Sequence, residues 1–144
     1  MHQITYAMRF TGRATPAGPD GNVLHARTSS PSSTITSLVG DTGLTGTIES
    51  VSGDEATFTS EVTFTSETDF LETGTITFGH DNTLLFSTVG SGRLAPSADP
   101  ARKHGTVMWQ VDQGTGQFAG ASGLITSNFF VDEQLGVVDH HFGV

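Results

Sequence analysis

The chain has 144 residues, a length that fits one domain, and we treat residues 1–144 as a single domain. Fifteen acidic against six basic residues give a formal net charge of −9. This charge predicts no nucleic-acid partner and no anionic membrane partner, because both need clustered basic side chains. The chain has no cysteine, which excludes disulfides, thiolate catalysis and cysteine-based zinc sites.

Alternation of apolar and polar residues predicts β-strands in the first half of the chain, because successive side chains of a strand point to opposite faces. Residues 3–13 alternate in this way. Residues 14–33 contain three prolines and are predicted to form a long loop or a short irregular crossing segment, which is a candidate lid. Further strands are expected at residues 34–39, 44–51, 56–64 and 69–79.

The second half continues this pattern. A strand is expected at residues 83–93, and a second long loop at residues 95–103, which contain Pro96 and Pro100. Three more strands are expected at residues 104–112, 117–131 and 136–144, of which the second is either one long strand or a strand bent at Gly120 and Gly123. Short strands with turns and no credible helix indicate an all-β sandwich or barrel, and a count of about eight favours the barrel. We therefore predict a single eight-stranded antiparallel β-barrel with an apolar lumen.

One glycine-rich stretch carries a family resemblance. Residues 113–123 read Gln-Gly-Thr-Gly-Gln-Phe-Ala-Gly-Ala-Ser-Gly, in which Gly114 and Gly116 allow the positive φ of a hairpin and Phe118 anchors the returning strand in the core. The stretch is similar to G-T-G-x-F-x-x-A-x-G in the allene oxide cyclase and dirigent proteins and their bacterial relatives. The resemblance implies an eight-stranded barrel with an apolar lumen, in which some members cyclise or couple reactive small molecules. It assigns no catalytic residue here.

Glu72 and the Asp139–His141 pair are the candidate catalytic residues. Glu72 alternates in step with Phe70, Ile76 and Phe78, so a strand that faces the lumen would bury its carboxyl group and make it a proton donor or acceptor. Asp139 and His141 share a strand face, where the aspartate can orient the histidine as a general base. The alternative interpretation is a rim position for Glu72 and a solvated outer face for the pair.

Four further residues are candidate substrate-binding residues: Tyr6, Phe70, His104 and Asn128. Tyr6 and Phe70 share apolar strand faces, whereas His104 and Asn128 are lone polar groups that can point into a pocket mouth. Such lone groups are more often satisfied locally. No metal site is predicted, because no H-x-H or H-E-x-x-H spacing occurs, and no cofactor is predicted, because no phosphate-binding loop occurs.

Three functions fit these observations. The first is a cofactor-independent enzyme of the cyclase, isomerase or hydratase type that acts on a small apolar molecule in the lumen. The second is a non-catalytic barrel that binds a small hydrophobic ligand, and the third is a structural module with a filled interior. Residues 107–111 and 124–131 are apolar on both faces, which predicts a homodimer or homotrimer. Without a recognisable signal peptide or a long apolar run, the expected location is cytoplasmic.

Overall fold

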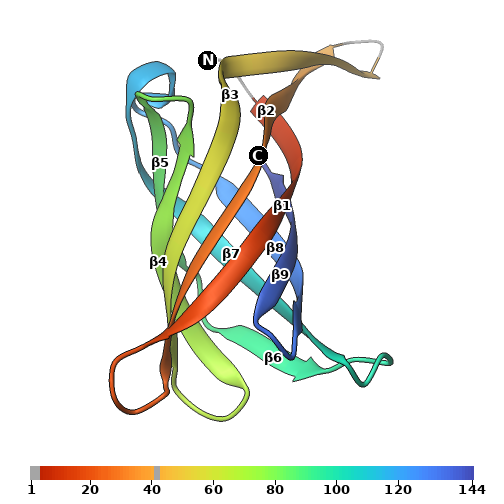
Figure 1. Ribbon diagram of the computed structural model, residues 1–144. Helices are drawn as coiled ribbons and strands as arrows, with labels where there is room; N and C mark the ends of the chain where they lie inside the picture. The colour runs from red at the N-terminus through yellow and green to blue at the C-terminus, as the bar shows by residue number, and fades with distance from the viewer. Residues whose placement is uncertain (1–3, 41–42) are drawn as a thin grey trace.

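The computed structural model describes the backbone of residues 4–40 and 43–144, and the side chains of residue 5 and residues 7–30 and 55–144. This part of the chain forms nine β-strands and one turn of 3-10 helix (Figure 1). The elements are β1 (Ile4–Ala17), β2 (Val23–Gly40), β3 (Gly43–Phe64), β4 (Asp69–Phe78), β5 (Asn82–Thr88), β6 (Gly92–Pro96), β7 (Arg102–Gly114), η1 (Gly116–Phe118), β8 (Leu124–Asp132) and β9 (Gly136–Gly143).

Eight of these strands close into an antiparallel barrel. They follow the order β3-β2-β1-β9-β8-β7-β5-β4, and β4 pairs with β3 to complete the ring. The ninth strand, β6, pairs with β4 and β7 beyond the end of β5. The predicted all-β, eight-stranded antiparallel barrel is therefore confirmed, with one additional strand.

The predicted long loop at residues 14–33 is wrong, and with it the candidate lid. β1 continues to Ala17 and β2 begins at Val23, so only residues 18–22 form the turn. Gly18 and Gly21 take positive φ values of 77° and 68° there, a conformation that glycine adopts without steric cost. The prolines misled the prediction because strands tolerate proline near their ends and at irregularities, and the pairing register shifts between Pro31 and Ser33.

Two other predicted boundaries also need correction. β6 occupies the first part of the expected loop at residues 95–103, which leaves residues 97–101 between β6 and β7. Residues 117–123 are not strand, because η1 and a glycine turn stand between β7 and β8. Phe118 is buried against Phe78, with ring centroids 5.1 Å apart, as expected for an anchor in the core. Gly116 has a φ of 62°, but Gly114 stays within β7 without a positive φ.

The hairpin of β2 and β3 is longer than the barrel. β3 pairs with β4 only from Ala56 onward, whereas β2 and β3 remain paired as far as Gly40 and Gly43. Residues 31–40 and 43–54, which we call the projecting hairpin, extend from the barrel end at which β1 starts and β9 ends (Figure 1). The opposite end carries the turns of the β1–β2, β3–β4 and β8–β9 hairpins.

The barrel interior contains both aromatic and polar side chains, so it differs from a simple apolar lumen. At mid-height the ring of Phe58 lies 5.4 Å from those of Phe86 and Trp109 and 6.1 Å from that of Phe10. The same inward faces carry buried polar residues: Ser60, Glu72, Ser127, Asp139 and His141. We call these five residues the interior polar cluster.

Candidate functional site

Glu72 points into the barrel because it alternates along β4 with the buried residues Phe70, Ile76 and Phe78. The pairing of β4 with β5 ends at Thr73 and Ser87, one residue before Glu72. At Glu72 the side-chain hydroxyl of Thr88 takes the place of a backbone partner. Glu72 N–H donates to Thr88 Oγ1 at 2.7 Å, and Thr88 Oγ1 donates to the Glu72 carbonyl at 2.8 Å. These two bonds fix the backbone that carries the carboxyl group.

The Glu72 carboxyl group is 5% exposed and has a donor on each oxygen. Ser60 Oγ donates to Oε1 at 2.6 Å, and Trp109 Nε1 donates to Oε2 at 3.2 Å. The pKa of Glu72 is raised from 4.5 to about 8, mainly by burial and to a smaller extent by the nearby charge of Asp139, and this value includes the opposing effect of the hydrogen bonds from Ser60 and Trp109, which lower it. Glu72 is therefore mainly protonated at neutral pH and can donate a proton.

Asp139 and His141 lie on the inward face of β9. Ser127 Oγ donates to Asp139 Oδ1 at 2.6 Å, and His141 Nε2 lies 2.8 Å from Asp139 Oδ2. The imidazole is enclosed by aromatic rings: its centroid lies 4.3 Å from that of Phe10 and 5.0 Å from that of Trp109. The histidine is 2% exposed and is held in place by this packing and by Asp139.

Glu72 and Asp139 line one small cavity of about 60 Å³. The cavity lies in the half of the barrel that carries the β1–β2 and β3–β4 turns. Most of its wall is apolar: Ala14, Ala26, Phe58, Val62, Phe64, Phe70, Leu94, Phe129, Val131 and Val137. The remaining lining residue is Thr28, which is 3% exposed and whose Oγ1 has no hydrogen-bond partner among the described residues. A buried hydroxyl in this state can bind a ligand atom or a water molecule.

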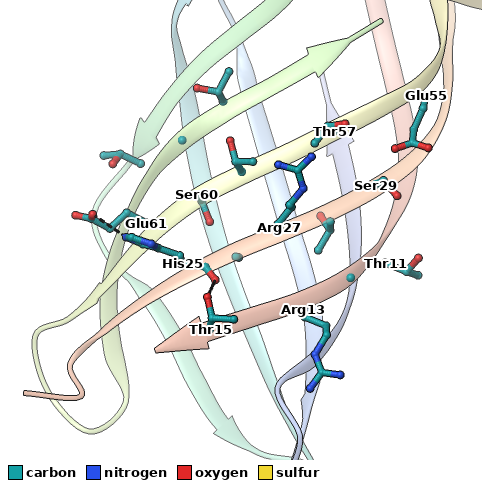
Figure 2. A pocket seen from close by; sticks show the side chains of 17 residues that line it. Thr11, Arg13, Thr15, His25, Arg27, Ser29, Glu55, Thr57, Ser60 and Glu61 are labelled. Atoms are coloured by element: carbon teal, nitrogen blue, oxygen red, sulfur yellow. Dashed lines mark hydrogen bonds and ion pairs between the residues drawn. The ribbon is translucent and has the colours of Figure 1, made fainter. Parts of the chain in front are cut away.

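A broader groove of about 910 Å³ lies on the outer wall, across β1, β2, β3 and β4 (Figure 2). Arg13 and Arg27 are direct cross-strand partners there, and Figure 2 shows their side chains pointing apart. Arg13 Nη2 donates to the Gln134 carbonyl at 2.8 Å, and His25 Nε2 lies 3.2 Å from Glu61 Oε2. These charged groups are exposed to solvent, so the groove does not combine burial with acid–base groups as the interior cavity does.

The part of the chain that the structure describes contains no group of three or more histidine, aspartate or glutamate side chains arranged to hold a metal ion. No helix within the described residues is long and apolar enough to cross a membrane. Comparison of the chain with protein-family models, curated proteins and solved structures finds no match.

The structure brings together four of the predicted site residues. Glu72, Asp139 and His141 are buried in the interior, and Phe70 lines the cavity. His141 contacts Asp139 but does not itself line the cavity. The side chain of Tyr6 lies outside the described residues.

His104 and Asn128, considered as residues that could point into a pocket mouth, do not line the cavity. Both are exposed on the outer wall, because the inward positions of β7 and β8 belong to Gly105, Val107, Ile125 and Ser127. His104 instead lies beside Phe130, with ring centroids 6.5 Å apart. Neither residue can reach the cavity from there.

Sequence reasoning missed three residues that complete the site: Thr28, Ser60 and Ser127. Ser60 and Ser127 each occupy an inward position within an apolar alternation, between Phe58 and Val62 and between Ile125 and Phe129. A buried serine between apolar neighbours requires a partner, and this requirement was the available signal. Thr28 lay inside the segment predicted to be a loop, so no face could be assigned to it.

Proposed function

We propose that this protein is a cofactor-independent enzyme that performs acid–base chemistry, of the isomerase, cyclase or hydratase type, on a small apolar molecule in the barrel interior. One observation carries the proposal: two carboxyl groups in different environments, those of Glu72 and Asp139, line the same small cavity. Two titratable groups whose surroundings favour different protonation states are the usual basis of paired acid and base roles.

In the proposed mechanism, the protonated Glu72 donates to an oxygen of the bound molecule, while Asp139 accepts a proton from a neighbouring carbon. The electron pair of the broken C–H bond forms a C=C bond, and the carbonyl becomes an enol. When the molecule also carries a C=C bond at the β,γ position, this enol is a conjugated dienol. Return of the Asp139 proton to the γ-carbon, together with return of the enol proton to Glu72, moves the C=C bond into conjugation with the re-formed carbonyl and regenerates both groups. General acid–base help of this kind contributes roughly 10²–10⁴-fold to a rate.

The other members of the interior polar cluster act through these two carboxyl groups. Ser127 and His141 approach the two oxygens of Asp139, which fixes the plane of that carboxyl group beside the cavity. Ser60 and Trp109 do the same for Glu72. They are positioning residues, because none of the four lines the cavity.

The size of the cavity limits the substrate. Pockets for drug-sized ligands are typically about 300–1,000 Å³, whereas this cavity measures about 60 Å³. It holds several times the space that one water molecule needs, on the order of 10–15 Å³ by the same kind of measure. It therefore accepts a small molecule or the reacting end of a longer one, with apolar atoms against the phenylalanine walls and an oxygen near Thr28.

The alternative is a binding barrel without chemistry, which the largely apolar wall also suits. The two functions separate in one experiment. Small ketones and unsaturated alcohols would be incubated with the protein in D₂O, and NMR would record binding, deuterium uptake next to the carbonyl, and new products. Three proteins would be compared: the wild type, Glu72→Gln and Thr28→Val.

For an enzyme, we expect deuterium uptake or product with the wild type, and a loss of about 10²-fold or more with Glu72→Gln. Thr28→Val should weaken ligand binding while the protein stays folded, because the hydroxyl it removes has no partner in the free protein. If ligands bind but deuterium exchanges into them at the same rate with and without protein, catalysis is rejected and the binding barrel is supported. Absence of any binding to the cavity would reject both functions.

A further inference from the structure

The outer wall of the barrel carries a contiguous exposed apolar surface. Its members, which we call the outer apolar patch, are 40–53% exposed: Met108, Leu124, Phe142 and Val144. The strand register makes them neighbours, because Thr126 pairs with both Met108 and Phe142. Leu124 and Val144 exchange two backbone hydrogen bonds of 3.0 Å. Clustered exposed apolar side chains of this kind mark an interaction surface more often than scattered ones do.

The projecting hairpin is a second feature that lacks a partner within the described chain. Its two strands pair with each other, and β1 adds only Ile4 and Thr5 along one side. The β3 edge of the hairpin has no neighbouring strand in the described residues until Ala56 meets β4. An isolated two-stranded hairpin is marginally stable in water, so the projecting hairpin requires packing against a further surface.

We infer that a second copy of this chain covers both features, with the projecting hairpin of each copy lying on the outer apolar patch of the other. Each chain carries one projecting hairpin and one outer apolar patch. A two-fold arrangement therefore covers both hairpins and both patches and leaves no such surface free for a third copy. Figure 1 shows the projecting hairpin at the barrel end at which β9 ends, and Phe142 of the patch lies at that end of β9. The hairpin sequence contains apolar residues for such a contact, among them Ile35, Val39 and Ile48.

The size of these surfaces is also suitable for a dimer. A standard protein interface involves about 20–30 residues on each side. The projecting hairpin and the patch together supply that order of residues. This inference is independent of the proposed chemistry, because neither surface contains a residue of the interior polar cluster or of the cavity lining.

Sedimentation equilibrium at micromolar concentration tests the assembly itself. We expect a dimer for the wild type, a shift toward monomer for Phe142→Ser, and no shift for Leu71→Ser, which replaces a residue of similar exposure (46%) on β4 outside the patch. Circular dichroism would confirm that both variants keep the β-sheet spectrum. A wild-type protein that sediments as a monomer would overturn the inference.

The absence of native cysteine allows a direct test of the contact. Ser37→Cys, on the hairpin, and Thr126→Cys, within the patch, would be prepared as separate proteins of different mass, mixed and oxidised. The arrangement predicts a disulfide-linked heterodimer of the two masses, and none when Thr73→Cys, on the outer face of β4, replaces Thr126→Cys. Disulfides that form only between two copies of Ser37→Cys would show hairpin-to-hairpin pairing and overturn the reciprocal arrangement.

Discussion

The raised pKa of Glu72 predicts how the stability of the protein changes with pH. Between pH 4.5 and about 8 the folded state binds one more proton at Glu72 than the unfolded state does. The free energy of unfolding therefore falls as pH rises through this window, by about 1.4 kcal/mol for each pH unit, and levels off above the folded pKa. The whole shift corresponds to about 5 kcal/mol, and the interval from pH 5.5 to 7.5 to about 2–3 kcal/mol.

Glu72→Gln removes this dependence, since the amide does not titrate. Urea unfolding, followed by the fluorescence of Trp109, the single tryptophan of the chain, would measure the free energy of unfolding of wild type and variant. Only the wild type loses stability through Glu72 as pH rises. We therefore expect the free energy of unfolding of the variant, relative to that of the wild type, to increase by about 2–3 kcal/mol from pH 5.5 to 7.5. Comparison at each pH cancels the titration of groups that the two proteins share.

Glu67→Gln is the matched control, because Glu67 is exposed on the turn between β3 and β4. Its stability relative to wild type should stay nearly constant over the same range. If Glu72→Gln also shows a constant difference, the carboxyl group of Glu72 is not held protonated in the folded state. That result would remove the proton donor from the proposed mechanism.

Three further substitutions test the packing and the hydrogen bonds by urea unfolding. Phe58→Ala empties the aromatic centre of the barrel and should cost about 3–5 kcal/mol, so a loss below about 1 kcal/mol would contradict the packing described. Ser127→Ala removes a fully buried donor to Asp139 and should cost about 1–3 kcal/mol, and an unchanged stability would argue against that bond. His25→Ala removes a solvent-exposed pair with Glu61 and should cost less than about 1 kcal/mol, so a larger loss would show an unrecognised role for the outer groove.

The inward faces of the strands were predictable because they follow from a two-residue period. Along β4 this period places Glu72 with Phe70 and Ile76, and along β9 it separates Asp139 and His141 from the exposed His140. A local pattern is enough to assign these faces, because the assignment needs only the bounds of the strand and not the identity of the neighbouring strands. The candidate acid–base residues of the site were therefore accessible from the sequence.

The partners of these residues were not predictable in the same way. Ser60 meets Glu72 because β3 and β4 pair in one register, and Ser127 meets Asp139 because β8 and β9 pair in another. Trp109 reaches Glu72 across 37 positions of sequence. Such contacts depend on strand order and register around a closed barrel, which no local pattern specifies. The misread segment 14–33 shows the same limit. It contains the end of β1 and the first part of β2, and only the pairing of β2 with β1 and β3 identifies these residues as strand.

The distribution of polar residues inside the barrel bears on which function the fold serves. Near the barrel end at which β9 ends, Phe78 and Phe118 pack together, and the buried polar residue beside them, Asn82, carries no ionisable group. An interior that had only to be filled could be built in this way throughout, because buried ionisable groups are often less stabilising than well-packed apolar residues of similar volume. The other half instead contains the carboxyl groups of Glu72 and Asp139, together with a Thr28 hydroxyl that has no partner among the described residues. These costly groups converge on one cavity rather than scattering over the core, and that convergence favours a chemical or ligand-binding role over a purely structural one.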